Sequence, residues 1–145
     1  AILDWLDELA GCERALIPAS GPGRRHVLKV CALATGLADK AVSLVYERVV
    51  HGRATPVWAA RCEQQIAGVL DELERDRTGR GWWGGDALGH ADIAVACVLR
   101  FVREAHPQLF HADRWPALAA HSDACEAMAA FSGVIQPFHI TPPQH

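Results

Sequence analysis

Apolar residues recur every three or four positions between Arg24 and His51, which is the spacing of an α-helix. They form one set on one side of the predicted helix (Val27, Val30, Cys31, Ala34, Ala38, Ala41, Val45 and Val49) and a second set on a different side (Leu33, Leu37, Leu44 and Tyr46). A helix that is apolar on two sides is buried on two sides. We therefore predict a long helix that contacts its own bundle on one side and another partner on the other.

Two further segments show helix-start signals. Thr55 and Pro56 suit an N-cap and a first turn, and the apolar face predicted after them is Val57, Ala60, Gln64, Ala67, Leu70 and Leu73. Pro116 opens another helix, and the residues beyond Phe131 form a non-helical tail. No alternating run of β-branched residues is present. The pattern predicts an all-α bundle of about five helices.

The segment from Gly84 to Ala96 predicts a loop that runs into a buried helix ending near Glu104. Gly89 fits the N-cap position and Asp92 falls at N3, from which its carboxylate can accept a hydrogen bond from the Gly89 amide. This half of a capping box needs no side chain at Gly89. We expect Gly89→Ser to add the other half and to stabilise the protein by a few tenths of a kcal/mol.

Composition narrows the class of protein. The 145 residues suit one domain of ordinary size, and the net charge of -3 argues against nucleic-acid binding because no basic stripe is present. No run approaches the ~20 apolar residues that cross a membrane. Asp4, Asp7 and Glu8 interrupt any signal peptide, and five cysteines without a Cys-x-x-Cys pair indicate reduced thiols, so we expect a cytoplasmic protein.

The eight histidines do not indicate a metal site. His121 and Cys125 lie four residues apart on one face of a predicted helix, and His106 and His111 flank Phe110. A zinc site needs three or four converging ligands, and no cluster in the sequence offers them. We predict solvated or core histidines and no metal.

Residues 85–94 resemble the start of the central helix in the C-terminal domain of bacterial glutathione transferases, which carries a Gly-Asp-x-Leu-[Ser/Thr]-x-Ala-Asp-[Ile/Tyr]-Ala pattern. The chain departs from it at Gly89. Further blocks agree in order: Ala34-x-Gly36-Leu37-Ala38-Asp39, Trp58-x-x-Arg61-x-x-x-Gln65, Trp82, Pro107-x-Leu109-Phe110 and Pro116-Ala117-Leu118. The resemblance implies that residues 1–10 end the last helix of an absent thioredoxin-like domain, residues 11–23 form a linker, and residues 24–145 form the all-helical C-terminal domain.

The resemblance also implies a function. In that family the catalytic Ser, Tyr or Cys lies in the thioredoxin-like domain, so we expect no catalytic residue and no cofactor here. The full-length protein would conjugate glutathione, its co-substrate, to small hydrophobic electrophiles as a homodimer. The alternatives are a non-catalytic interaction module and a Cys-dependent glutathione reductase or isomerase of the same superfamily.

Four residues of the long helix are candidates for substrate binding. Asp39 matches an acidic position that, in several members, reaches the γ-glutamyl amino group of glutathione across the dimer interface; the alternative is a local partner such as Lys40. Val42, Tyr46 and Val49 share the helical side that lines the electrophile cleft in the resembled enzymes. The alternative for Tyr46 is packing at a domain seam. For Asp92 we predict a structural role at the N-cap and no catalytic one.

Overall fold

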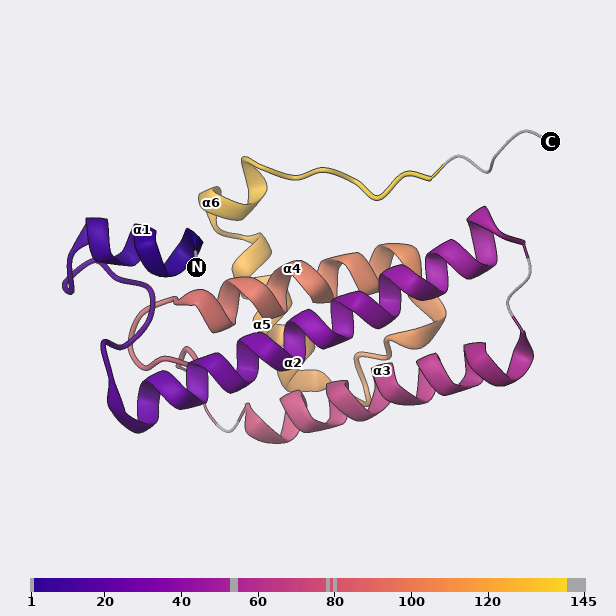
Figure 1. The fold of residues 1–145 in the computed structure, drawn as a ribbon, viewed down its shortest axis with the longest axis horizontal. Helices are drawn as coiled ribbons and strands as arrows, with labels where there is room; N and C mark the ends of the chain where they lie inside the picture. Colours follow the sequence, from indigo (N-terminus) through magenta and orange to yellow (C-terminus); the bar gives the residue numbers. More distant parts are fainter. Residues whose placement is uncertain (1, 53–54, 78, 80, 141–145) are drawn as a thin grey trace.

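The computed structural model describes residues 2–52, 55–77, 79 and 81–140. Eight helical elements follow one another (Figure 1): α1 (Ile2–Ala10), α2 (Gly21–Val45), the π-helix η1 (Tyr46–Val50), α3 (Pro56–Asp76), α4 (His90–Ala105), the short 3-10 helix η2 (Pro107–Leu109), α5 (Pro116–Glu126) and α6 (Ala129–Ser132). Within these ranges no β-strand occurs, and the all-α prediction is confirmed. The long helix begins at Gly21, where Ser20 occupies the N-cap position and Pro22 suits the first turn.

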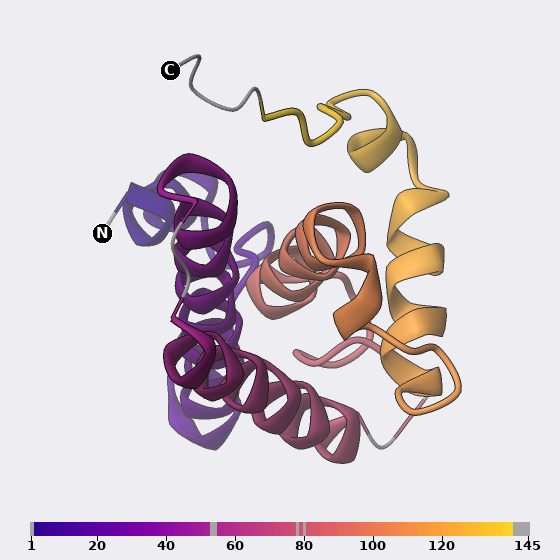
Figure 2. The same cartoon turned by 90° about the vertical axis from the view of Figure 1, so that its right-hand side faces the viewer.

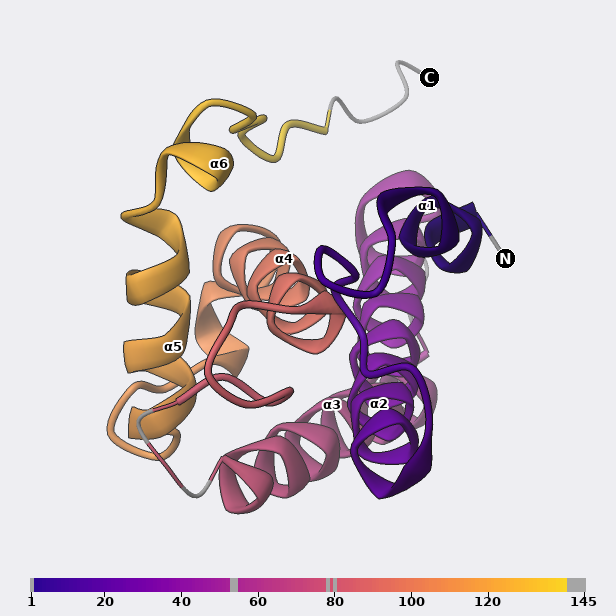
Figure 3. The ribbon, with the colours of Figure 1, turned by 90° about the vertical axis from the view of Figure 1, so that its left-hand side faces the viewer.

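Helix α4 is the centre of the bundle. Figures 2 and 3 show it between α2 on one side and α5 on the other, with α3 crossing below. It packs against α2 and α5, and its buried residues include Val95, Leu99 and Val102, which are fully inaccessible to solvent. Asp92 is the one charged residue in the first ten of this helix, and so apolar a segment is stable only when other helices surround it. The predicted burial of this segment is confirmed.

The predicted apolar face of α3 is wrong in its first half. Val57 is 85% exposed, and Ala60 and Gln64 are also on the surface. The buried stripe is instead Cys62, Ile66, Leu70 and Leu73, of which only the two leucines were predicted. Small and polar residues near the helix start allow two apolar phases, and only packing against α2 and α5 selects one of them.

The start of α4 combines a local cap with two contacts from distant parts of the chain. Asp92 Oδ2 accepts a hydrogen bond from the Gly89 amide at 3.0 Å, as the spacing suggested, and Asp92 Oδ1 accepts one from the Trp83 amide at 3.1 Å. The His90 amide donates to the carbonyl oxygen of Leu16 at 2.9 Å. The linker therefore passes directly over the first turn of the helix and satisfies one of its open donors.

This close passage overturns the expected gain from Gly89→Ser. The backbone of Gly89 is extended (φ -135°), so a serine could adopt it, but a Cβ there would lie 2.6 Å from the Leu16 carbonyl oxygen. We expect Gly89→Ser to lower the free energy of unfolding by about 1–3 kcal/mol, measured in urea melts. Gly84→Ser is the matched control, because its Cβ would meet only Val27 Cγ2 at 3.7 Å. A Gly89→Ser protein as stable as the parent would contradict the contact with Leu16.

Candidate functional site

The C-terminal half of α2 and the π-helix η1 that continues it carry the residues predicted to bind substrate. Asp39, Val42 and Tyr46 are spaced by three and four residues and share one face of the helix, and all three are exposed. Val42 is 39% and Tyr46 54% accessible, which is high for large apolar side chains on a helix whose other face forms the core. Asp39 forms no ion pair with any described residue, so the local partner considered for it is not present in this structure.

The fourth predicted residue, Val49, lies in the π-helix and is half-buried. The wider turn is closed by a hydrogen bond from the His51 amide to the Tyr46 carbonyl oxygen at 2.9 Å. A π-helix has more residues per turn than an α-helix, so Val49 no longer lies on the line of Val42 and Tyr46. Such π-turns are frequent at functional sites. The structure therefore brings Asp39, Val42 and Tyr46 onto one exposed face and places Val49 at its margin.

A buried histidine attaches this half of α2 to the end of α4. His106 Nε2 donates to the Ala41 carbonyl oxygen at 2.8 Å, and burial lowers the pKa of His106. The ring is therefore neutral and carries its proton on Nε2. Its ring also meets Phe101 edge-on at 6.4 Å between centroids. Because Ala41 precedes Val42, this contact fixes the exposed face relative to α4.

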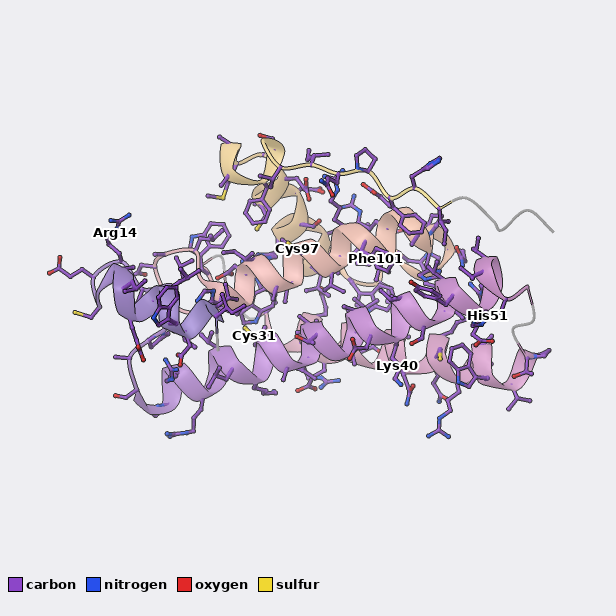
Figure 4. The ribbon with its side chains drawn as sticks, turned by 45° about the horizontal axis from the view of Figure 1, so that its top comes forward. Arg14, Cys31, Lys40, His51, Cys97 and Phe101 are labelled. Atoms are coloured by element: carbon purple, nitrogen blue, oxygen red, sulfur yellow. The ribbon has the colours of Figure 1, made fainter. Side chains whose placement is uncertain are left out.

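The C-terminal tail crosses α4 and forms an aromatic crevice that the sequence did not indicate. The rings of Phe138 and Phe101 meet edge-on at 5.3 Å between centroids, and the Phe138 amide donates to Glu104 Oε2 at 2.6 Å. A cavity of about 330 Å³ lies between the tail and α4, with Cys97 and Phe101 on its helix side (Figure 4). The sequence analysis did not identify Phe101 and Phe138 as neighbours, because they are far apart in the sequence and no local pattern indicates the contact.

Helix α1 turns its polar face to the bundle and its apolar face outward. His90 Nε2 lies 2.7 Å from Asp7 Oδ2, the Leu16 amide donates to Asp7 Oδ1 at 2.9 Å, and Arg24 pairs with Asp4 at 2.6 Å. On the other face, four large residues are between 46% and 75% exposed: Ile2, Trp5, Leu6 and Leu9. An apolar stripe of this kind is typical of a surface that another protein part covers.

Burial and pairing explain the titration behaviour of Asp7. Desolvation acts to raise the pKa of this carboxyl, but the Leu16 amide and the His90 ring outweigh it, and the pKa is lowered overall. The carboxylate therefore stays ionised and continues to hold α1 against the start of α4.

The cysteines show no activated thiolate among those with a resolved shift. Burial is the main cause that raises the pKa of Cys31, of Cys97 and of Cys125, the last to about 11. A thiol with a raised pKa is a poor nucleophile at neutral pH. Nothing in the described part of the chain gathers three metal-ligating side chains, and none of its helices has the length and apolar content to cross a bilayer. His106 and His121 are buried in the core, which is one of the two environments predicted for the histidines.

Comparison with known proteins gives a consistent family. Residues 56–124 match the model of the glutathione S-transferase C-terminal domain. A glutathione S-transferase from Methylobacterium radiotolerans, solved with glutathione sulfonate, is 30% identical to this chain with a TM-score of 0.85. The match covers 99% of this chain and 68% of the transferase. One from Methylobacillus flagellatus with glutathione bound is 28% identical (92% and 66% covered, TM-score 0.80). Maleylpyruvate isomerase from Pseudomonas aeruginosa is 25% identical (90% and 69%, TM-score 0.69). No curated protein matches significantly.

Proposed function

Because this chain belongs to the glutathione S-transferase family, we propose that it forms the electrophile wall and part of a homodimer interface in an enzyme that conjugates glutathione to small hydrophobic electrophiles. The observation that carries the proposal is the alignment of nearly the whole chain with an enzyme solved with glutathione sulfonate. The chain spans about two thirds of that structure, 68% of its length.

The exposed face that α2 shares with the start of η1 offers the groups that bind a hydrophobic electrophile. Val42 offers an aliphatic surface, and Tyr46 offers both an aromatic ring and a hydroxyl donor. An aromatic electrophile would stack on the ring and direct a polar substituent to the hydroxyl. The neighbouring contact of His106 with Ala41 keeps this face fixed while substrate binds.

We assign activation of the glutathione thiol to a thioredoxin-like domain, as in the resembled enzymes, with no cofactor. The outward stripe of α1 is the surface to which that domain would pack, since Ile2, Trp5, Leu6 and Leu9 lie exposed there. The raised thiol pKa values of Cys31, Cys97 and Cys125 do not favour any of these three as the nucleophile. Asp39 would cross the dimer interface to the γ-glutamyl ammonium of the partner's glutathione.

The isomerase neighbour favours a second candidate function, a glutathione-dependent isomerase of the same superfamily. In that case glutathione is recovered after each turnover. Consumption of free thiol therefore separates the two reactions, because only conjugation removes it.

The test is a steady-state assay of the longer protein with glutathione and a panel of small aryl halides. We expect thiol consumption with the intact protein and none with the 145-residue chain alone, because we assign activation of the thiol to the thioredoxin-like domain. Turnover by the chain alone at a rate like that of the intact protein would contradict the division of labour between the two domains.

Two variants of the intact protein report on the two substrates separately and serve as each other's control. Tyr46→Ala is expected to change the ranking of the aryl halides by kcat/KM and to leave the KM for glutathione unchanged. Asp39→Ala is expected to raise the KM for glutathione about tenfold, as for loss of one charged contact, and to keep the ranking. Equal losses toward every electrophile in Tyr46→Ala, together with lower stability, would indicate that Tyr46 packs a domain seam instead.

A further inference from the structure

On the far side of the bundle from α1 lies a cavity of about 380 Å³ that the proposed function does not use. Figures 2 and 3 show α5 on the opposite side of α4 from α1 and α2. The cavity is lined by α5 and by Arg77, Gly79 and Trp82, which lie between α3 and α4 in the chain. It is therefore separate from the substrate face of α2.

The apolar wall of the cavity is built from small side chains and one large ring. Ala117, Ala120 and Ala124 are spaced by three and four residues along α5 and leave room above the helix. Trp82 also lines the cavity, and its ring meets that of His121 edge-on at 5.8 Å between centroids. A planar aromatic ligand fits beside an indole ring and a row of methyl groups, where it buries apolar surface without displacing a larger side chain.

The polar end of the cavity is the guanidinium of Arg77. It lies over the ring of Trp83 at 4.9 Å, donates to the Gly79 carbonyl oxygen at 3.2 Å, and approaches His121 Nδ1 at 3.4 Å. These contacts are to neutral groups, and none of the ion pairs between described residues includes Arg77. Its Nε atom is buried without a hydrogen-bond partner among the described residues. The guanidinium is thus held in place by neutral groups and forms no ion pair with a described residue.

His121 holds Arg77 in this orientation and adds no charge. Its Nε2 lies 3.2 Å from the carbonyl oxygen of Asp92, which can only accept, so the proton resides on Nε2 and Nδ1 is the acceptor for Arg77. Burial lowers the pKa of His121, which keeps the ring neutral. The Asp92 carboxylate, 4.0 Å from Nδ1, is already engaged by two backbone amides.

From this combination we infer a binding site for a small aromatic carboxylate. The carboxylate would pair with the terminal nitrogens of Arg77, and the ring would lie against Trp82 and the alanines of α5. No acidic side chain lines the cavity within the described residues. The charge of Arg77 favours an anionic ligand, and the apolar walls favour an aromatic ring over a small polar ion.

The test titrates the purified protein with benzoate in a phosphate-free buffer, using saturation-transfer NMR. Benzamide, a neutral molecule of the same shape, and inorganic phosphate are the comparison probes. We expect saturable benzoate binding that is at least about tenfold tighter than that of benzamide or phosphate. Benzamide lacks the charge-assisted pair with Arg77, and phosphate lacks the ring that the apolar walls bury. Equal binding of benzamide would overturn the role of Arg77. Binding of phosphate without benzoate, or no binding at all, would overturn the site.

Variants locate the site. Arg77→Gln should weaken benzoate binding about tenfold or more. Arg75→Gln, two residues from Arg77, removes an exposed charge that is paired with Glu72, and it should change benzoate binding less than about twofold. Should Arg77→Gln unfold the protein, Ala120→Leu decides, because it fills the cavity from the surface of α5; Ala60→Leu on α3 is its control. Unchanged binding in Ala120→Leu would contradict the site. An excess of a glutathione conjugate should not displace benzoate, and displacement would place the ligand in the substrate site instead.

Discussion

Asp92→Ala is expected to lower the free energy of unfolding by about 3–5 kcal/mol. The carboxylate is fully buried and accepts hydrogen bonds from the Gly89 and Trp83 amides. Alanine leaves both donors without a partner in the core, and each unpaired buried donor costs about 1–3 kcal/mol. It also removes a negative charge from the positive end of the helix dipole of α4. Urea melts followed by far-ultraviolet circular dichroism measure the loss.

Two further variants test whether the loss comes from the buried hydrogen bonds of Asp92. Asp86→Ala removes an exposed carboxylate from the same loop and should change the stability by less than about 0.5 kcal/mol. Asp92→Asn keeps the size and one acceptor oxygen but sets an amide group against one backbone donor, so it should fall between Asp92→Ala and the parent. An Asp92→Ala protein as stable as the parent would mean that the two amides find other partners.

Trp115→Ala is expected to cost about 3–5 kcal/mol, the range for removing a buried tryptophan from a core. The side chain is 1% exposed, and its indole nitrogen donates to Asp71 Oδ1 at 2.8 Å. The Arg114 guanidinium covers its ring at 4.7 Å, and Phe110 lies 5.6 Å away between centroids. Trp115 therefore joins the start of α5 to the C-terminal half of α3.

The matched control is Trp5→Ala. The same residue type on α1 is 56% exposed, so its removal should leave the stability of the isolated chain within about 0.5 kcal/mol. Trp115→Phe keeps an aromatic ring but loses the hydrogen bond to Asp71, and should give a smaller loss than alanine. Equal effects of Trp115→Ala and Trp5→Ala would contradict the packing of α5 on α3.

The helix starts illustrate which features were predictable. Pro56 and Pro116 do stand first in α3 and α5, because a proline at the first helical position acts on its own backbone and needs no distant partner. The start of α5 is also capped by a distant side chain that the local sequence does not indicate. Glu74 of α3 accepts hydrogen bonds from the Ala117 and Leu118 amides at 2.8 and 2.9 Å, across more than forty residues of chain.

Candidate site residues divide in the same way. Asp39, Val42 and Tyr46 could be placed on one face because helical spacing alone decides it, and their roles in binding stay predictions. Val49 could not be placed, since nothing in residues 46–50 shows where an α-helix widens to a π-helix. The aromatic pair of Phe101 and Phe138 and the cavity at Arg77 depend on chain segments that meet only after folding.

The sequence by itself determined the all-α class, the positions of the long helices and the family, because periodicity, capping and ordered blocks are properties of short stretches. Tertiary structure alone decided which side of α3 is buried and where the tail crosses α4. It also decided why residue 89 is glycine: the Leu16 carbonyl oxygen would lie 2.6 Å from any Cβ there. Such contacts depend on the path of a distant segment, which local preferences do not encode.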